Sequence, residues 1–127
     1  MSTLWAPQAL KDAADPNRVK IVTTVKNRAI YFSRSLIPNM SRSSSPYGDY
    51  KVHVGLYAYR AWALKGYCNK TLSQLAEHEL LEQLYFIENE IPVYAEKSNV
   101  PIKAGIDTLR DYQLANQHNL TGKELHL

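Results

Sequence analysis

The order of hydrophobic and polar residues predicts strands in the first half of the chain. Residues 19–25 are rich in β-branched side chains, residues 26–28 are polar, and residues 29–33 return to an extended pattern. Two strand-like runs joined by a short polar segment are typical of a β-hairpin. Residues 39–49 consist mostly of small polar and turn-forming types, so we expect a loop there.

The second half alternates between strand-like and helix-like patterns. Residues 52–60 predict a strong strand, and residues 61–67 predict a short helix that ends at Gly66. Leucine and isoleucine then recur at helical intervals, and Thr71 and Gln74 have the spacing of a capping box. We therefore predict one amphipathic helix over residues 72–90.

The two ends of the chain carry weaker patterns. Residues 1–18 show no clear period, and only a turn at residues 15–17 is indicated. After Pro92, which cannot continue a helix, we predict a short strand at 93–96, a closing helix at 108–117 and a frayed tail at 118–127. Strands and helices in this order indicate one α/β domain spanning residues 1–127.

Composition and charge narrow the class of protein. The chain has 45% hydrophobic and 21% charged residues and a net charge of +3, which is typical of a globular protein and mildly favours anionic ligands. Lysine and arginine are scattered among acidic residues, so we expect no nucleic-acid partner. No signal peptide and no apolar run of about 20 residues is present, which favours a cytoplasmic protein without a membrane partner.

The predicted strand at residues 52–60 carries the most informative side chains. Because strand side chains alternate, His53, Gly55, Tyr57 and Tyr59 share one face, while Val54, Leu56 and Ala58 on the other face suit a core. An imidazole and a phenol beside a glycine gap can grip a polyhydroxylated or carboxylated ligand. The alternative is an ordinary solvated strand face.

Other polar residues allow two interpretations each. Arg34 can bind a carboxylate or remain a surface arginine, and Glu79, Glu82 and Gln83 can line a site or form the solvent edge of the predicted helix. Asp107 precedes the closing helix, so it can cap that helix or offer an oxygen to Mg²⁺. The sequence contains no glycine-rich phosphate loop and no Cys/His cluster with zinc spacing.

Four stretches in order carry a resemblance to a known family. They are Tyr-Phe-Ser-Arg-Ser-Leu-Ile-Pro at 31–38, His-Val-Gly-Leu-Tyr-Ala-Tyr-Arg at 53–60, Leu-Glu-Gln-Leu at 81–84 and Gly-Ile-Asp-Thr at 105–108. Together they resemble the C-terminal half of the 3-deoxy-manno-octulosonate cytidylyltransferases (CMP-KDO synthetases), over residues 1–117. The resemblance implies the mixed-sheet C-terminal portion of an α/β, nucleotide-diphospho-sugar transferase-like fold, without the N-terminal nucleotide-binding half.

The same resemblance implies a function and a site. Members of the family join CTP to 3-deoxy-D-manno-octulosonate (KDO) in a Mg²⁺-dependent reaction that releases pyrophosphate and feeds lipopolysaccharide or capsule synthesis. Asp107 resembles a Mg²⁺ ligand, and a homodimer is implied. The residues that match the sugar-acid pocket are Arg34, His53, Tyr57, Glu82 and Gln83.

The matched half alone implies limits on activity. CTP would bind only with the missing half, so we expect an isolated chain to be inactive; a non-catalytic sugar-acid-binding or dimerisation module is the alternative. Departures from the family pattern at Tyr85 and Leu109 leave a related 2-keto sugar acid open as the ligand.

Overall fold

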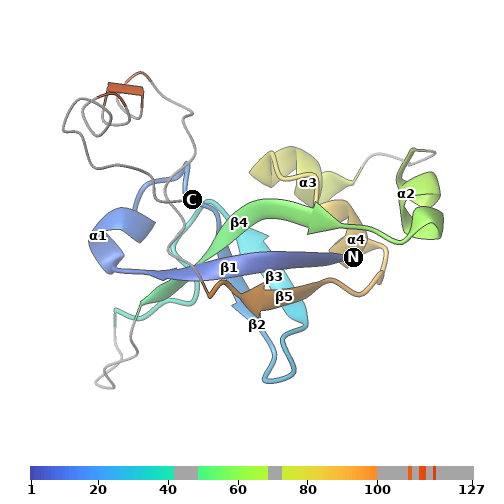
Figure 1. The fold of residues 1–127 in the computed structure, drawn as a ribbon, viewed down its shortest axis with the longest axis horizontal. Helices are drawn as coiled ribbons and strands as arrows, with labels where there is room; N and C mark the ends of the chain where they lie inside the picture. Colours follow the sequence, from blue (N-terminus) through green and yellow to red (C-terminus); the bar gives the residue numbers. More distant parts are fainter. Residues whose placement is uncertain (42–48, 69–72, 100–108, 110–111, 114–115, 117–127) are drawn as a thin grey trace, which may run out of the picture.

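A computed structural model describes residues 1–41, 49–68, 73–99, 109, 112–113 and 116. Within these residues the core of the fold is a five-stranded mixed sheet in the order β3-β2-β4-β1-β5 (Figure 1). The strands are β1 Ser2–Gln8, β2 Lys20–Thr23, β3 Ala29–Ser33, β4 Tyr50–Ala58 and β5 Tyr94–Lys97. β1 runs antiparallel to β4 and parallel to β5, and β2 runs antiparallel to β3.

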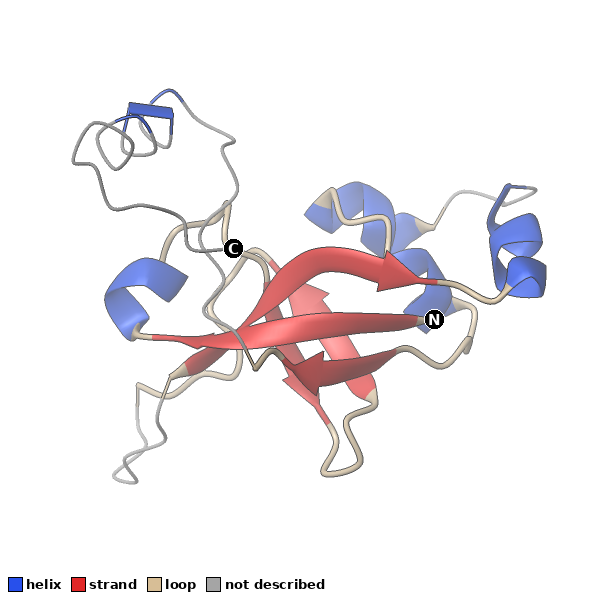
Figure 2. Ribbon diagram, viewed as in Figure 1, coloured by secondary structure: helices blue, strands red, loops and turns tan. Residues whose placement is uncertain are grey.

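Four short helices lie at the two ends of the sheet. They are α1 Leu10–Ala13, α2 Ala61–Cys68, α3 Gln74–Glu79 and α4 Leu84–Glu88. Figure 2 shows α1 at one end of the sheet, with α2, α3 and α4 gathered at the other. The predicted α/β class with a mixed sheet is confirmed.

Several predicted elements are present at nearly the predicted bounds. The hairpin is formed by β2 and β3, the strong strand is β4, and the short strand is β5, one residue later than expected. α2 continues through Gly66 to Cys68. Of the predicted closing helix, residues 109, 112, 113 and 116 are helical, and its other residues lie outside the described part of the chain, as do residues 42–48 of the predicted loop.

Strand β1, which lies between β4 and β5, was not predicted from the sequence. Its residues, STLWAPQ, combine weak strand formers with a proline. β1 pairs with β5 only as far as Trp5. Pro7 lies beyond this point, where one side of β1 is unpaired and a missing N–H is tolerated. β1 is therefore a strand because it pairs with β4 and β5, and not because its own residues favour that conformation.

The prediction of one helix over residues 72–90 is wrong, because the chain breaks at Leu80. Leu80 has a left-handed conformation with φ of 53°, and the following N–H, that of Leu81, donates to the Ala76 carbonyl at 3.0 Å. The cap of α3 is Ser73, whose Oγ accepts from the Ala76 N–H; Thr71, the predicted cap, lies outside the described residues. Glu79 and Gln83 therefore do not share a helix face.

Replacing Leu80 by glycine is expected to raise the free energy of unfolding by about 0.5–1 kcal/mol. The side chain is 74% exposed, so little packing is lost, and glycine adopts a left-handed conformation without strain. Urea denaturation at pH 7 measures the change. Leu64→Gly, at an exposed position inside α2, is the matched control and should lower stability by about 1 kcal/mol. A Leu80→Gly chain as unstable as that control would contradict the explanation.

The main core lies between one face of the sheet and the helices α3 and α4. Phe32, Ala95, Leu84 and Phe86 are among its buried members. The prediction that Val54, Leu56 and Ala58 face the core is wrong, since Leu56 is 63% exposed. The helices α3 and α4 cover the face of the sheet on which the ring of His53 lies 5.1 Å from that of Phe32. The side of β4 that carries His53 is therefore the one that faces the core.

Candidate functional site

A bulge in β4 brings His53 and Tyr57 together. Leu4 of β1 pairs with Val54 while Thr3 pairs with Tyr57, so Gly55 and Leu56 have no counterpart on β1. In a regular strand, residues four apart are separated by about 13 Å. Here the ring centroids of His53 and Tyr57 are only 5.3 Å apart. The predicted sharing of one face is thus confirmed, in a tighter geometry than alternation alone would give.

The hydrogen bonds of His53 define which ring nitrogen is available. Its Nε2 lies 2.9 Å from Thr3 Oγ1, and that hydroxyl can donate to the carbonyl of Leu56 at 2.8 Å or of Val54 at 3.1 Å. A hydroxyl that donates to a carbonyl must accept from the imidazole, which places the proton on Nε2. Nδ1 is then left as a hydrogen-bond acceptor.

Burial controls the protonation of both rings. It lowers the pKa of His53 to about 4, so the imidazole is neutral at pH 7. Burial, with smaller effects from Tyr59 and Glu82, raises the pKa of Tyr57 to about 12. The Tyr57 phenol therefore stays protonated, and the site offers a neutral acceptor beside a neutral donor.

Stability is expected to fall as His53 is protonated. The folded pKa of about 4 lies below the ordinary 6.5, so the stabilisation is complete above about pH 6.5 and is lost as the pH falls towards 4. The loss should be on the order of 2 kcal/mol, measured by urea denaturation across this range. His53→Asn should flatten this part of the profile, whereas His78→Asn, at an exposed histidine of α3, should not. Equal profiles for the two variants would contradict the assignment.

Glu82 and Gln83 reach the same region from the turn that begins α4. The carboxylate of Glu82 is close enough to raise the pKa of both Tyr57 and Tyr59. Gln83 is buried, and its side chain makes no capping hydrogen bond to the helix that follows it. Tyr59 contacts Phe86 of α4 with ring centroids 5.6 Å apart. The strand and the helix are therefore packed together beside these groups.

Arg34 follows β3 as predicted, but all three of its side-chain nitrogens donate hydrogen bonds to backbone carbonyls. Nε donates to Glu79 at 2.9 Å, Nη1 to Pro16 at 3.2 Å and Nη2 to Leu80 at 3.3 Å. An arginine has five N–H groups, so two remain for a ligand. The bonds of Arg34 to Glu79 and Leu80 stabilise the turn between α3 and α4, and this turn carries Glu82 and Gln83.

Glu79, which the sequence offered as a candidate, and Lys20, which it did not, complete this network. The Glu79 carboxylate accepts from Ser33 Oγ at 2.6 Å and from the Arg34 N–H at 2.9 Å. Lys20 is fully buried, and its ammonium donates to the carbonyls of Asp15, Arg18 and Arg34. The only signal for Lys20 was a lysine inside a β-branched run.

The predicted metal ligand cannot be placed in this geometry. Asp107 lies outside the described residues. Within the part of the chain that is described, no three His, Cys, Asp or Glu side chains form a group that could hold a metal ion.

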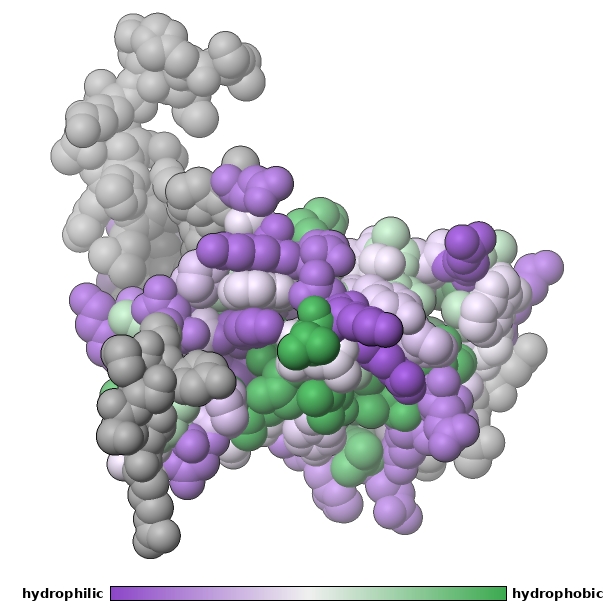
Figure 3. Space-filling view, turned by 90° about the horizontal axis from the view of Figure 1, so that it is seen from below, coloured by the Kyte–Doolittle hydropathy of each residue, from purple (hydrophilic) through white to green (hydrophobic). Residues whose placement is uncertain are grey.

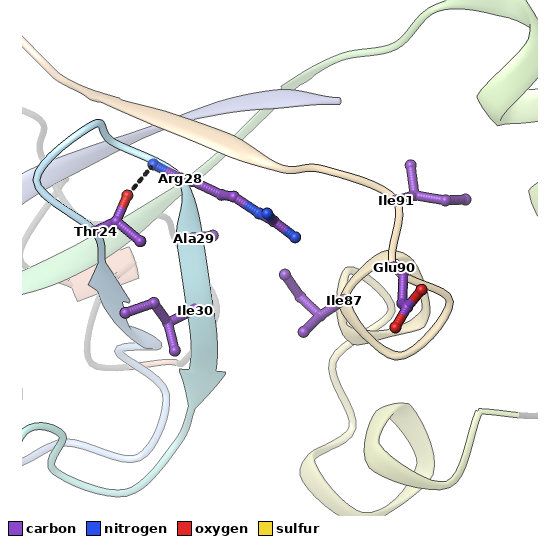
Figure 4. Close-up of a pocket in the computed structure, with 7 residues that line it drawn as sticks. All are labelled: Thr24, Arg28, Ala29, Ile30, Ile87, Glu90 and Ile91. Atoms are coloured by element: carbon purple, nitrogen blue, oxygen red, sulfur yellow. Dashed lines mark hydrogen bonds between the residues drawn. The ribbon is translucent and has the colours of Figure 1, made fainter.

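A cleft of about 260 Å³ lies on a different surface, between the β2–β3 hairpin and α4. Figure 4 shows Arg28 extending from the hairpin toward Ile87, with Glu90 beyond it. Apolar side chains gather on this underside of the molecule (Figure 3). The cleft contains none of the predicted site residues and is smaller than most ligand pockets. The site around His53 remains the better candidate because donors and acceptors converge there. The residues lining the cleft are Thr24, Arg28, Ala29, Ile30, Ile87, Glu90 and Ile91.

None of the described helices has the length and apolar character needed to cross a bilayer.

Comparison with known proteins agrees with this fold. A family model described as cytidylyltransferase matches residues 1–116. The chain is 40% identical over 125 residues to the 3-deoxy-manno-octulosonate cytidylyltransferase of Acidobacterium capsulatum, covering 98% of this chain and 50% of that protein. The enzyme of the same name from Koribacter versatilis is 39% identical over 111 residues, covering 87% of this chain and 42% of that protein.

A solved structure matches as well. CMP:2-keto-3-deoxy-manno-octonic acid synthetase complexed with CTP superposes with a TM-score of 0.81 at 30% identity, covering 94% of this chain and 48% of that one. The chain therefore spans about half the length of the proteins it matches. The match over residues 1–116 and the shared mixed sheet show that the chain belongs to the cytidylyltransferase family, in which its relatives are the CMP-KDO synthetases.

Proposed function

We propose that this chain forms the sugar-acid-binding part of a 3-deoxy-manno-octulosonate cytidylyltransferase, which converts CTP and KDO to CMP-KDO and pyrophosphate in the cytoplasm. One observation carries the proposal. His53, Tyr57 and Glu82, which match the family's pocket, come from β4 and the start of α4 and interact directly or through their charges. The 40% identity to a relative of that name supports the choice of ligand.

Each group in the site has a distinct task in this proposal. Neutral His53 accepts from a sugar hydroxyl at Nδ1, and the Tyr57 phenol donates to another. Glu82 accepts from hydroxyls, Gln83 can donate and accept, and Arg34 offers its two remaining N–H groups to the carboxylate. Together they orient the anomeric hydroxyl for attack on the α-phosphate of CTP, so their contribution is positioning. A related 2-keto sugar acid with the same carboxylate and hydroxyls would use the same groups.

The proposal includes Mg²⁺ with Asp107 as one ligand. Mg²⁺ commonly takes one or two carboxylates and completes its shell with water and substrate phosphate oxygens. A single aspartate is therefore compatible with the ion's preferences, although the described residues add no cluster of ligands. When bound, Mg²⁺ neutralises charge on the phosphates.

Activity on CTP is proposed only for this chain together with the remainder of a cytidylyltransferase, because the chain spans 50% of its relative. Alone, it is proposed to bind the sugar acid without turnover. The same half-length match favours a second candidate, a non-catalytic sugar-acid-binding or dimerisation module that forms a homodimer.

Titration of the purified chain with KDO tests the proposal. We expect saturable binding by calorimetry that weakens at least about tenfold in His53→Ala, since an alanine leaves one ligand hydroxyl without its acceptor. His78→Ala, an exposed histidine of α3, is the matched control and should bind as the unchanged chain does. Absence of binding by the unchanged chain, or equal binding by both variants, would reject the assigned site.

A further inference from the structure

One buried hydroxyl of β1 connects the bulge of β4 to the candidate site. Thr3 is 4% exposed, and its Oγ1 lies within hydrogen-bonding distance of three groups on β4. These are the Leu56 carbonyl at 2.8 Å, the Val54 carbonyl at 3.1 Å and His53 Nε2 at 2.9 Å. The backbone of Thr3 pairs with Tyr57 across the bulge. The distortion that brings Tyr57 to His53 therefore also places two carbonyls at the Thr3 hydroxyl.

The Thr3 hydroxyl has a single proton, and the two carbonyls decide where it goes. A carbonyl can only accept, so a hydroxyl that donates to Leu56 or Val54 presents a lone pair to His53. His53 meets that lone pair as a donor only when its proton is on Nε2. The other tautomer would draw the Thr3 proton to Nε2 and take this donor from both carbonyls, which should disfavour it about tenfold.

Neighbouring groups keep the His53 ring in the orientation that this bond requires. Phe32 meets the imidazole edge-on with ring centroids 5.1 Å apart, and the Tyr57 ring lies at 5.3 Å. The main chain is fixed as well, since the His53 N–H donates to the Val19 carbonyl at 2.8 Å. Because the two nitrogens of an imidazole diverge, Nδ1 then points away from Thr3.

We propose that Thr3 sets the hydrogen-bond polarity of the candidate site: its hydroxyl keeps His53 in the Nε2–H tautomer, so Nδ1 accepts a hydrogen bond from the ligand and never donates one. The inference rests on the proposed function and adds to it a positioning residue and a rule of selectivity. A sugar hydroxyl can donate to Nδ1, whereas a carboxylate or a keto oxygen has no proton to give. The carboxylate of the sugar acid is therefore excluded from His53 and directed to Arg34.

This polarity separates ligands that share a carboxylate. A site built around a hydroxyl donor rejects an analogue without that donor, because its own buried acceptor is left unpaired. Among 2-keto sugar acids, those that present a hydroxyl to Nδ1 should bind. Those with fluorine, hydrogen or a keto oxygen at the same position should bind weakly.

¹⁵N NMR of the 127-residue chain without ligand tests the tautomer directly. The protonated and the bare nitrogen of a neutral imidazole give well-separated signals, and we expect the protonated one at Nε2 of His53. Thr3→Val keeps the shape of the side chain without its hydroxyl, so the two signals should move towards each other as the tautomers mix. Thr3→Ser should restore them. A proton on Nδ1 in the unchanged chain, or unchanged signals in Thr3→Val, overturns the inference.

Thr23→Val is the matched control for Thr3→Val. Thr23 is a partly buried residue of β2 whose Oγ1 bonds Lys51 Nζ at 2.6 Å. The same substitution therefore removes a hydrogen bond from the same sheet, but from Lys51 rather than from His53, and it should leave the imidazole signals in place. Thr3→Ala is measured beside Thr3→Val so that a packing defect in one variant does not decide the result. Thermal melts verify that each variant folds.

Titration with KDO measures what the tautomer contributes to binding. KDO affinity should fall about tenfold in Thr3→Val and stay unchanged in Thr3→Ser and Thr23→Val. A panel of KDO analogues, each with one hydroxyl replaced by fluorine, identifies the donor. One analogue should bind the unchanged chain about tenfold more weakly than KDO, and this loss should be absent in Thr3→Val because both changes remove the same contact. Equal losses in the two chains reject the rule of selectivity.

The two measurements separate this inference from the proposed function. KDO binding together with an unchanged tautomer in Thr3→Val rejects the role of Thr3 and leaves the proposed function standing. The expected change of tautomer in a chain that binds no KDO rejects the sugar-acid site and supports the role of Thr3.

Discussion

Replacing Phe86 by alanine is expected to lower the free energy of unfolding by about 3–5 kcal/mol, the largest effect that we expect from a single substitution. Phe86 is 1% exposed and stacks on Tyr67 with ring centroids 5.4 Å apart. It also contacts Tyr59 and Tyr85. Truncation leaves a cavity among these rings beneath the start of α4. Since small domains are stable by only about 5–15 kcal/mol, part of the population should unfold at room temperature.

Urea denaturation followed by tryptophan fluorescence measures this loss, because Trp5 packs against the same core. Tyr94→Ala, an aromatic on β5 with 46% exposure, is the control and should change stability by less than about 1 kcal/mol. Glu82 and Gln83 lie immediately before α4, so the surviving folded Phe86→Ala chain should also bind KDO more weakly. A loss of stability no larger than in the control would mean that Phe86 does not hold α4 to the sheet.

Replacing Lys20 by alanine is expected to lower the free energy of unfolding by about 3 kcal/mol. The Lys20 ammonium is surrounded by the carbonyls of Asp15, Arg18 and Arg34, which lose their donor in the variant. Burial lowers the pKa of Lys20, and the nearby Asp15 opposes that shift. The side chain of Arg34 also donates to the carbonyls of Glu79 and Leu80. Loss of the Lys20 bond to Arg34 should therefore make the turn that carries Glu82 and Gln83 less stable.

Chemical denaturation and amide exchange near Glu79 measure the effect. Lys26→Ala in the hairpin turn removes an equal charge from an exposed position and should be nearly neutral. Lys20→Met keeps the length of the side chain without its donors and should lose most of the same stability. If Lys20→Met is as stable as the unchanged chain, the hydrogen bonds to the three carbonyls are not what stabilises this region.

The site differs most from its sequence prediction in the role of Arg34. The side chain already bonds the carbonyls of Pro16, Glu79 and Leu80. Part of its task in the proposed site is therefore to position Glu82 and Gln83. No periodicity in the sequence could show this, because the three carbonyls come from two segments distant from residue 34.

Local patterns predicted the elements whose own residues favour them. The hairpin of β2 and β3, the strand β4 and the helix α2 have strong preferences over short stretches, and each formed near its expected bounds. β1 was not predicted, because a strand paired on both sides with neighbours far along the chain needs little preference of its own. The prediction of a single helix at 72–90 was wrong because hydrophobic spacing cannot reveal a left-handed residue such as Leu80, whose carbonyl accepts a hydrogen bond from Arg34 just beyond β3.

The order of residues was enough to establish the α/β class, the family resemblance and the residue types of the candidate site, since composition and spacing are properties of the chain. Contacts between distant segments were needed to show that a bulge at Gly55 and Leu56 brings His53 to 5.3 Å from Tyr57. The same contacts make α4 cover this face of β4 and leave Leu56 exposed. The reason is that these features depend on pairings across the fold, whose energies no single stretch of sequence contains.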